Sequence, residues 1–310
     1  MSAPESASNE ASRDDTDVYR ASTIKRQRRT RSELDQLDAQ IIEVLCADHP
    51  QSVRHVFYQM TNPRLAVPVE KSDRGYRHVQ ERCVRLRRAG VLPYDWIADM
   101  SRRGYFVDTF SGAGDFLRRM RGLYRADLWR GADCRCEVWV ESRSIASVVL
   151  DDCQELAVPL YPCGGFSSVS FVHEAAAQHN DSDDGRPLVV FYVGDFDPAG
   201  VLIDRSLERE LRKHLDSAID LDFARIAINE EQIAQYDLPT KPRKVTDRRS
   251  PEVAATVEAE AMPASVLRGL LRIAIEELLP ENALAVAKVA EESEREHIGR
   301  MAALFNGANE

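Results

Sequence analysis

Two aspartates follow an apolar run in the second half of the chain. Residues 187–193 (PLVVFYV) lead directly into Asp195 and Asp197, after which Pro198 and Gly200 turn the chain. Carboxylates one residue apart at the carboxyl end of a buried strand supply the hard oxygen ligands that Mg²⁺ prefers. The competing interpretation is a loop aspartate followed by a helix N-cap, and the DFD sequence taken alone favours that simpler interpretation.

A glutamate earlier in the chain strengthens the metal hypothesis. Glu141 ends the strand-like segment EVWVE, and the glycine-rich turn PCGGFSS at 162–168 separates it from the two aspartates. A glutamate at one strand end, a glycine turn, and DxDPxG at a later strand end resemble Toprim, the metal-binding domain of topoisomerases, primases and some nucleases. The resemblance implies that Glu141, Asp195 and Asp197 hold Mg²⁺, with Mn²⁺ as a substitute.

A tyrosine and an arginine in the first half form a second chemical candidate. Arg54 lies four residues before Tyr58, so on a helix both side chains share one face. A phenol has a pKa of about 10 and is a weak nucleophile at neutral pH unless a cation or base lies nearby. Arg54 is therefore a candidate to bind a phosphate that Tyr58 attacks, and the alternative is a tyrosine with a purely structural role.

The segment around this pair resembles a known motif. SVRHVFYQM at 52–60 is similar to the active-tyrosine motif of the topoisomerase VI A subunit and of the related enzymes that make meiotic double-strand breaks; Arg54, Phe57 and Tyr58 match its arginine and two aromatics. Segments 76–99, 238–249 and 257–263 resemble later parts of the same family, so the likeness covers about 34–280. One departure is Ser142, where many relatives carry lysine.

The family resemblance implies a type IIB topoisomerase A-like, DNA-cleaving activity. Tyr58 would attack a phosphodiester with the help of Arg54 and leave a 5′-phosphotyrosine link. Each tyrosine would work with the Toprim site of a partner protomer in a homodimer, and ATP-driven strand passage would need a separate ATPase subunit. Two alternatives remain open: a Toprim nuclease that uses metal-activated water, and a non-catalytic DNA-binding protein of the same fold.

Charge is distributed unevenly along the chain. The net charge is −10, yet residues 20–130 carry 22 Lys and Arg against 13 Asp and Glu, whereas residues 131–310 carry 18 against 33. Such asymmetry suggests a polyanion, here double-stranded DNA, as the partner of the basic half. The basic arm at 20–31 (RASTIKRQRRTR) is a further candidate for phosphate binding. Glu258 and Glu260 belong either near the metal site or on an exposed edge.

The surrounding pattern predicts an α/β protein in three parts. We expect residues 1–31 to form a disordered tail and basic arm. Residues 32–130, with helical periodicity followed by VLPYDWIAD and RRGYFVDTF, predict a winged-helix-like DNA-binding domain. Residues 131–310 alternate strands and helices, which predicts a Toprim domain with a mainly parallel sheet flanked by helices. No apolar run approaches the roughly 18 residues of a membrane span, and we expect a cytoplasmic, nucleoid-associated protein.

Overall fold

The computed structural model describes residues 29–98, 107–164, 169–182, 185–243, 250, 253 and 255–307. The amino-terminal tail and most of the basic arm lie outside these residues. Among the described residues, no helix is long and apolar enough to cross a membrane.

Three helices form the amino-terminal half: α1 (Arg31–Ala47), α2 (Val53–Met60) and α3 (Asp73–Arg88). Hydroxyl side chains cap all three, because Thr30, Ser52 and Ser72 each accept a hydrogen bond from a backbone N–H in the first turn. The faces that meet carry the apolar residues Leu37, Ile41, Leu45, Val56, Phe57, Met60, Val79, Cys83 and Leu86. After η1 (Tyr94–Trp96), Ile97 forms an isolated parallel bridge with Gln51; residues 99–106 of the expected ribbon lie outside the described residues.

A parallel sheet of four strands forms the centre of the second half. The strands are β1 (Arg135–Val140), β2 (Leu160–Pro162), β3 (Leu188–Val193) and β4 (Leu221–Ala227). Their order is β2-β1-β3-β4, and every neighbouring pair is parallel. All six residues of β3 are buried, as expected for a central strand covered on both faces. The predicted α/β class with a parallel sheet is therefore confirmed.

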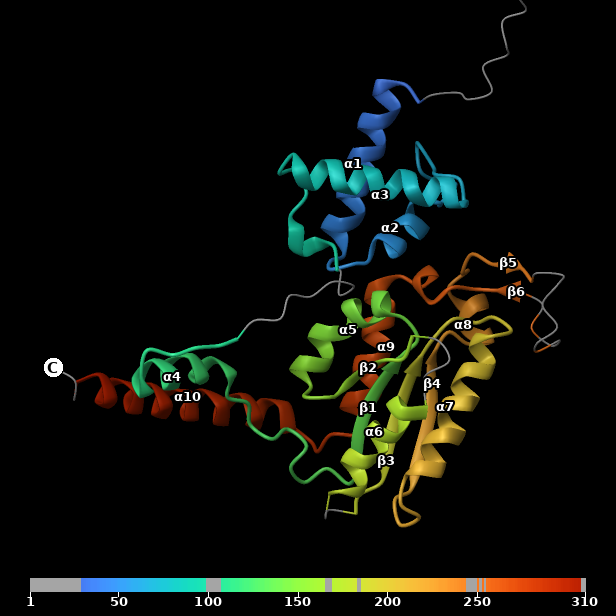
Figure 1. Ribbon diagram of the computed structural model, residues 1–310. Helices are drawn as coiled ribbons and strands as arrows, with labels where there is room; N and C mark the ends of the chain where they lie inside the picture. The colour runs from blue at the N-terminus through green and yellow to red at the C-terminus, as the bar shows by residue number, and fades with distance from the viewer. Residues whose placement is uncertain are drawn as a thin grey trace, which may run out of the picture.

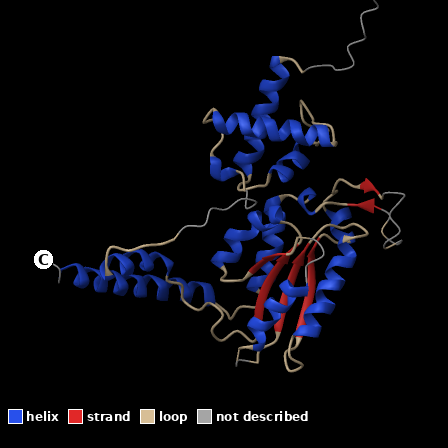
Figure 2. Ribbon diagram, viewed as in Figure 1, coloured by secondary structure: helices blue, strands red, loops and turns tan. Residues whose placement is uncertain are grey.

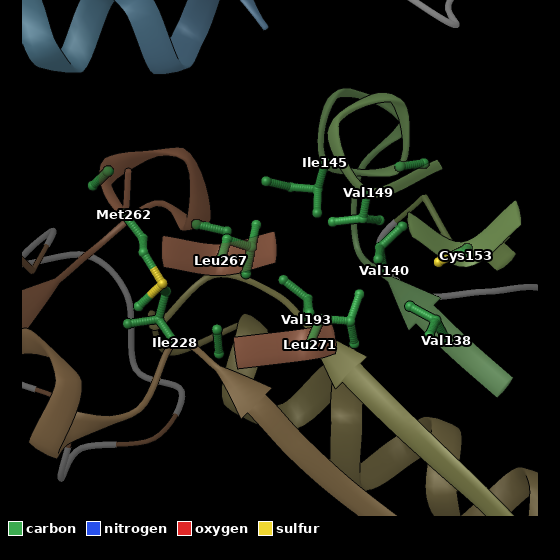
Figure 3. Packing of buried hydrophobic residues seen from close by; sticks show 14 of the residues in the cluster. Val138, Val140, Ile145, Val149, Cys153, Val193, Ile228, Met262, Leu267 and Leu271 are labelled. Atoms are coloured by element: carbon green, nitrogen blue, oxygen red, sulfur yellow. The ribbon is translucent and has the colours of Figure 1, made fainter. Parts of the chain in front are cut away.

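Helices cover both faces of this sheet, as Figure 2 shows. On one face α5 (Arg143–Glu155) and α9 (Ala264–Glu276) share a core with Val138 and Val140 of β1 (Figure 3). On the other face α6 (Val169–Asn180) and α7 (Gly200–His214) pack with Trp139. The alternation along β1 follows from the two-residue period of a strand.

A pair of helices extends from this body. The segment 115–129 predicts one helix from its sequence, whereas the structure has α4 (Ala113–Met120) followed by the single turn η2 (Arg121–Leu123). α4 packs against α10 (Ala283–Gly307), far from it in sequence but beside it in Figure 1. The pairing is reinforced by Arg295, whose guanidinium donates to the Tyr124 carbonyl at 2.8 Å.

The two halves meet beyond the carboxyl ends of the strands, where Figure 1 places α1–α3. The remaining short elements lie on this side: α8 (Glu230–Gln235), β5 (Lys241–Pro242), β6 (Ala255–Thr256) and η3 (Ala259–Ala261). η3 packs against α2, and Arg268 of α9 pairs with Asp48 and donates to the Pro50 carbonyl. One continuous hydrophobic cluster includes residues of both halves, so the halves share a core at this junction.

Candidate functional site

The predicted acidic residues lie together at the ends of two neighbouring strands. Val140, the last residue of β1, pairs with Val193, the last residue of β3. Glu141 follows directly, and its Oε2 accepts a hydrogen bond of 2.9 Å from the backbone N–H of Asp195. The carboxyl ends of adjacent parallel strands thus bring Glu141 and Asp195 to one place, as the sequence predicts.

Two glycines keep this turn compact. A Cβ atom at Gly194 would lie 2.6 Å from the Tyr192 hydroxyl and 2.8 Å from Oε2 of Glu141. A Cβ atom at Gly200 would lie 2.2 Å from the Asp195 carbonyl oxygen. All three distances are shorter than real Cβ contacts. The neighbour of Gly200 is backbone and cannot move aside, so only glycine fits there, whereas the neighbours of Gly194 are the ends of two side chains.

Asp197 lies in the turn that leads into α7, whose N-cap residue is Ala199. Its Oδ1 accepts hydrogen bonds from the backbone N–H groups of Ala199 at 2.8 Å and Gly200 at 2.6 Å. These bonds stabilise the turn before α7, which is close to the capping role that the simpler interpretation of DFD predicts, and both use the same oxygen. The capping role and a ligand role for the second oxygen are therefore compatible in one side chain.

Burial and mutual repulsion destabilise the charged form of this cluster. Burial, and then the charge of Glu141, raise the pKa of Asp195 to about 8. Burial also raises the pKa of Glu141, to which the charge of Asp197 adds. Glu260 of η3, which is 6% exposed, has its pKa raised mainly by burial as well. Several carboxyl groups that resist ionisation lie together here. A bound cation would stabilise their ionised form.

The donor atoms of this cluster meet part of what Mg²⁺ requires. Carboxylate oxygens are suitable ligands, and the buried hydroxyl of Tyr192 beside Glu141 has no hydrogen-bond partner among the described residues. Within the same residues, no three His, Cys, Asp or Glu side chains already converge as a group that could hold a metal ion. The fit to Mg²⁺ therefore rests on donor chemistry and charge and not on a preformed cage.

Arg225 of β4 organises the acidic turn, and the sequence analysis missed it. Its guanidinium donates to the carbonyl oxygens of Gly194 at 3.1 Å, Asp195 at 3.2 Å and Gly200 at 2.9 Å. It also pairs with Asp204 at 2.6 Å. An arginine inside the otherwise apolar stretch ARIAI was the available signal, because a buried guanidinium requires several acceptors.

Tyr58 lies at the junction of the two halves and is 6% exposed. Burial raises its pKa well above the usual value for a tyrosine, and the negative charge of Glu258 and a hydrogen bond with it add to the effect. The side chain is therefore a neutral phenol in this state, under the influence of a carboxylate from the second half of the chain.

Cations surround this phenol. Arg54 pairs with Oε2 of Glu258, while Lys241 pairs with Oε1 at 2.8 Å. Lys71 lies with Nζ 5.5 Å from the centre of the Tyr58 ring. Burial alone would raise the pKa of Glu258, but its hydrogen bonds with Lys241 and Arg54 outweigh burial and hold the pKa below its ordinary value. Glu258 is thus a firmly ionised carboxylate beside the candidate tyrosine.

The two candidate sites are electrostatically connected within one chain. The charges of Glu258 and Glu260 contribute to the raised pKa of Asp195, and the same two charges act on Tyr58. The backbone N–H of Ala259, between them, donates to Oδ1 of Asp195 at 2.8 Å. Of the two locations considered for these glutamates, the structure places them between the acidic cluster and Tyr58.

A row of exposed arginines lies along α3. Arg74, Arg77, Arg85 and Arg88 are exposed. Arg82, which the sequence places on the same polar face, instead forms a paired contact with Asp38 of α1, with one bond of 2.6 Å. The exposed four occur at helical spacing on one side and can contact successive phosphates.

Comparisons with models of protein families, with curated proteins and with solved structures found no match for this chain.

Proposed function

We propose that this protein is a Mg²⁺-dependent, DNA-cleaving transesterase in which a winged-helix-like domain supplies Tyr58 and a Toprim-like domain supplies the metal site. One observation carries the proposal: Lys241 lies 5.9 Å from the centre of the Tyr58 ring and binds Glu258, which also pairs with Arg54 and whose neighbour Ala259 is hydrogen-bonded to Asp195. Residues from both halves that the sequence singled out for chemistry are thereby held in one region. In this proposal the protein acts as a homodimer on double-stranded DNA, and strand passage requires a separate ATPase subunit.

The chemistry assigned to each residue is simple. The Tyr58 oxygen attacks phosphorus, the bond between phosphorus and the 3′ oxygen breaks, and the tyrosine proton ends on that oxygen. Arg54 binds the phosphate and offsets the charge of the transition state. Glu141, Asp195 and Asp197 would hold Mg²⁺, which neutralises charge on the transferring phosphate when bound.

A water-using nuclease is the second candidate function. The observation that favours it is the burial of Tyr58 and the upward shift of its pKa, because a buried neutral phenol is a poor nucleophile. A metal site at the strand ends would act without this tyrosine.

Covalent trapping distinguishes the two functions. Supercoiled plasmid is incubated with the protein, with and without Mg²⁺, then denatured with detergent and analysed before and after protease treatment. We expect DNA to remain bound to protein, and Tyr58→Phe to abolish the adduct because it removes only the hydroxyl. Tyr94→Phe, at an exposed tyrosine of the same half, is the matched control.

Robust Mg²⁺-dependent cutting by Tyr58→Phe protein, with free DNA ends, would establish the nuclease instead. Binding without cleavage by the wild-type protein under all conditions, including an added ATPase partner, would support a non-catalytic DNA-binding role.

A further inference from the structure

Three cationic side chains surround Tyr58, and they come from three separate segments. Arg54 lies on α2, Lys71 lies in the loop between α2 and α3, and Lys241 lies on β5 of the other half. The Lys71 and Lys241 ammonium groups are 5.5 Å and 5.9 Å from the centre of the Tyr58 ring. The fold thus concentrates positive charge around one phenol.

Backbone contacts hold this arrangement across the junction. Nζ of Lys71 donates to the carbonyl oxygens of Pro239 at 2.8 Å and Thr240 at 3.2 Å, immediately before Lys241. Burial lowers the pKa of Lys71, and repulsion from Lys241 lowers it further. Two ammonium groups are therefore held near each other at an electrostatic cost, which a bound anion would remove.

A carboxylate already bridges two of the cations. Glu258 presents Oε2 to Arg54 and Oε1 to Lys241, so its two oxygens contact one cation from each half. The other acid near this point is Glu260, whose pKa is raised mainly by burial and which also interacts with Arg54. Glu258 is consequently the main ionised counter-charge of the three cations.

We propose that Arg54, Lys71 and Lys241 form a binding site for a DNA phosphodiester over Tyr58, and that Glu258 occupies it as an internal anion until DNA displaces it. This inference rests on the proposed transesterase function and assigns two further binding residues and a resting state to it. A phosphodiester matches the carboxylate because it carries one negative charge and two free oxygens.

The exchange also places the reacting atoms. Lys241 binds Oε1 of Glu258 at 2.8 Å and lies 5.9 Å from the centre of the Tyr58 ring, so a phosphate in place of the carboxylate lies beside the tyrosine. Displacement removes a negative charge that raises the pKa of Tyr58, while the cations remain. The Tyr58 oxygen–phosphorus bond then forms as the bond from phosphorus to the 3′ oxygen breaks, and the phenol proton passes to that oxygen. No other reactant is required.

The test measures binding of the full chain to a short fluorescent DNA duplex in EDTA, where cleavage is not needed. Loss of one phosphate contact should reduce the salt dependence of log K by about 0.9, and we expect Lys71→Ala and Lys241→Ala each to weaken binding on the order of tenfold at low salt. Glu258→Gln should strengthen binding several-fold because the internal competitor loses its charge.

Matched controls come from an ion pair on α7. Lys213 pairs with Glu210 at 2.6 Å and is comparably exposed, so Lys213→Ala and Glu210→Gln change the same charges away from the junction. Circular dichroism and thermal melting check that each variant folds, and Lys241→Arg should retain most of the affinity of the wild type. The inference is overturned if Lys71→Ala and Lys241→Ala bind like Lys213→Ala, or if Glu258→Gln binds no more tightly than Glu210→Gln.

Two further outcomes distinguish failure of this phosphate site from failure of the transesterase function on which it rests. If wild-type protein forms the Tyr58 adduct but the three junction variants bind DNA normally, the phosphate site fails and the transesterase stands. If the variants behave as expected but no adduct forms, the transesterase fails and the phosphate site stands. Inorganic phosphate and chloride are each titrated against the bound duplex. If phosphate displaces the duplex at a far lower concentration than chloride does, the site is a small-anion site and the assignment to DNA is overturned.

Discussion

Glu141 and Asp195 are 54 residues apart in sequence, yet the backbone N–H of one donates to the carboxylate of the other at 2.9 Å. The bond ties the end of β1 to the end of β3 and holds two acidic side chains in a buried turn. Because burial and the charge of Glu141 both oppose ionisation of Asp195, the turn is more stable when its charge is neutralised.

Replacement of Asp195 by Asn should separate metal binding from folding. The amide oxygen can still accept the Ala259 N–H, but the buried charge is lost. We expect weaker Mg²⁺ and Mn²⁺ binding by calorimetric titration. In metal-free protein above about pH 8 we expect stability to rise by on the order of 1 kcal/mol, measured by urea unfolding.

Asp222→Asn, at an exposed aspartate of β4, is the control and should leave both measurements unchanged. Indistinguishable isotherms for the wild type and Asp195→Asn would return the DFD segment to a helix-capping role only.

The exposed arginines of α3 should contribute to DNA affinity. We expect the double change Arg77→Ala and Arg85→Ala to weaken duplex binding and to reduce the slope of log K against log salt by about 2, since each phosphate contact contributes about 0.9. Fluorescence anisotropy over a series of salt concentrations measures both.

Arg205→Ala with Arg209→Ala makes the same charge change on α7 of the acidic half. An equal loss of affinity in this control would show that overall charge, and not the α3 face, determines binding.

His55 should make the protein sensitive to mild acid. It is 1% exposed, its Nδ1 lies 2.8 Å from the Ser52 hydroxyl, and burial lowers its pKa from 6.5 to about 3. The pKa of His55 in the folded protein lies below its pKa in the unfolded chain. The folded state therefore has its full stability above pH 6.5 and loses part of it as the pH falls towards 3. The slope is at most about 1.4 kcal/mol per pH unit.

His55→Asn should flatten this dependence, as measured by urea unfolding at a series of pH values. His297→Asn, at an exposed histidine of α10, should not. A steep acid dependence that survives in His55→Asn would assign the sensitivity to other groups.

Mixed dimers should show how the proposed active sites are assembled. Tyr58→Phe protein lacks the nucleophile, and Asp195→Asn protein lacks a ligand. If each tyrosine works with the acids of a partner, a mixture contains dimers with one intact composite site, and we expect nicked plasmid without double-strand breaks.

Each variant alone should be inactive, and light scattering should show a dimer in the presence of DNA. A strictly monomeric protein that cleaves DNA would instead show that Tyr58 works with the acids of its own chain. The charge of Glu258, from the second half of the same chain, already acts on Tyr58.

The strands, and the acidic residues that follow them, could be predicted because local sequence patterns specify them. The apolar run before Asp195 indicates a buried strand, and strand ends in a parallel sheet meet at one edge, so the proximity of Glu141 to Asp195 followed from the pattern. The helix predicted over 115–129 instead ends at Met120 and is followed by one 3₁₀ turn.

The cationic residues around Tyr58 could not be predicted in the same way. Lys71 lies in a loop and Lys241 in a two-residue strand, neither with a periodic pattern, and only the contact between the halves brings Lys241 to the tyrosine. The role of Arg225 likewise depends on three carbonyl oxygens of a distant turn. Such long-range contacts depend on tertiary packing, which a one-dimensional pattern does not encode.

The pairing of α4 with α10 has a consequence for how the chain matures during synthesis. Ala126 bonds to Glu291 across 165 residues, and Arg54 bonds to Glu258 across 204. At about 5–20 residues per second, a ribosome needs roughly ten to forty seconds to make the second residue of each pair after it has made the first. The tyrosine helix therefore exists before its counter-charge, and the nascent chain acquires the complete arrangement only after Glu291 has been made.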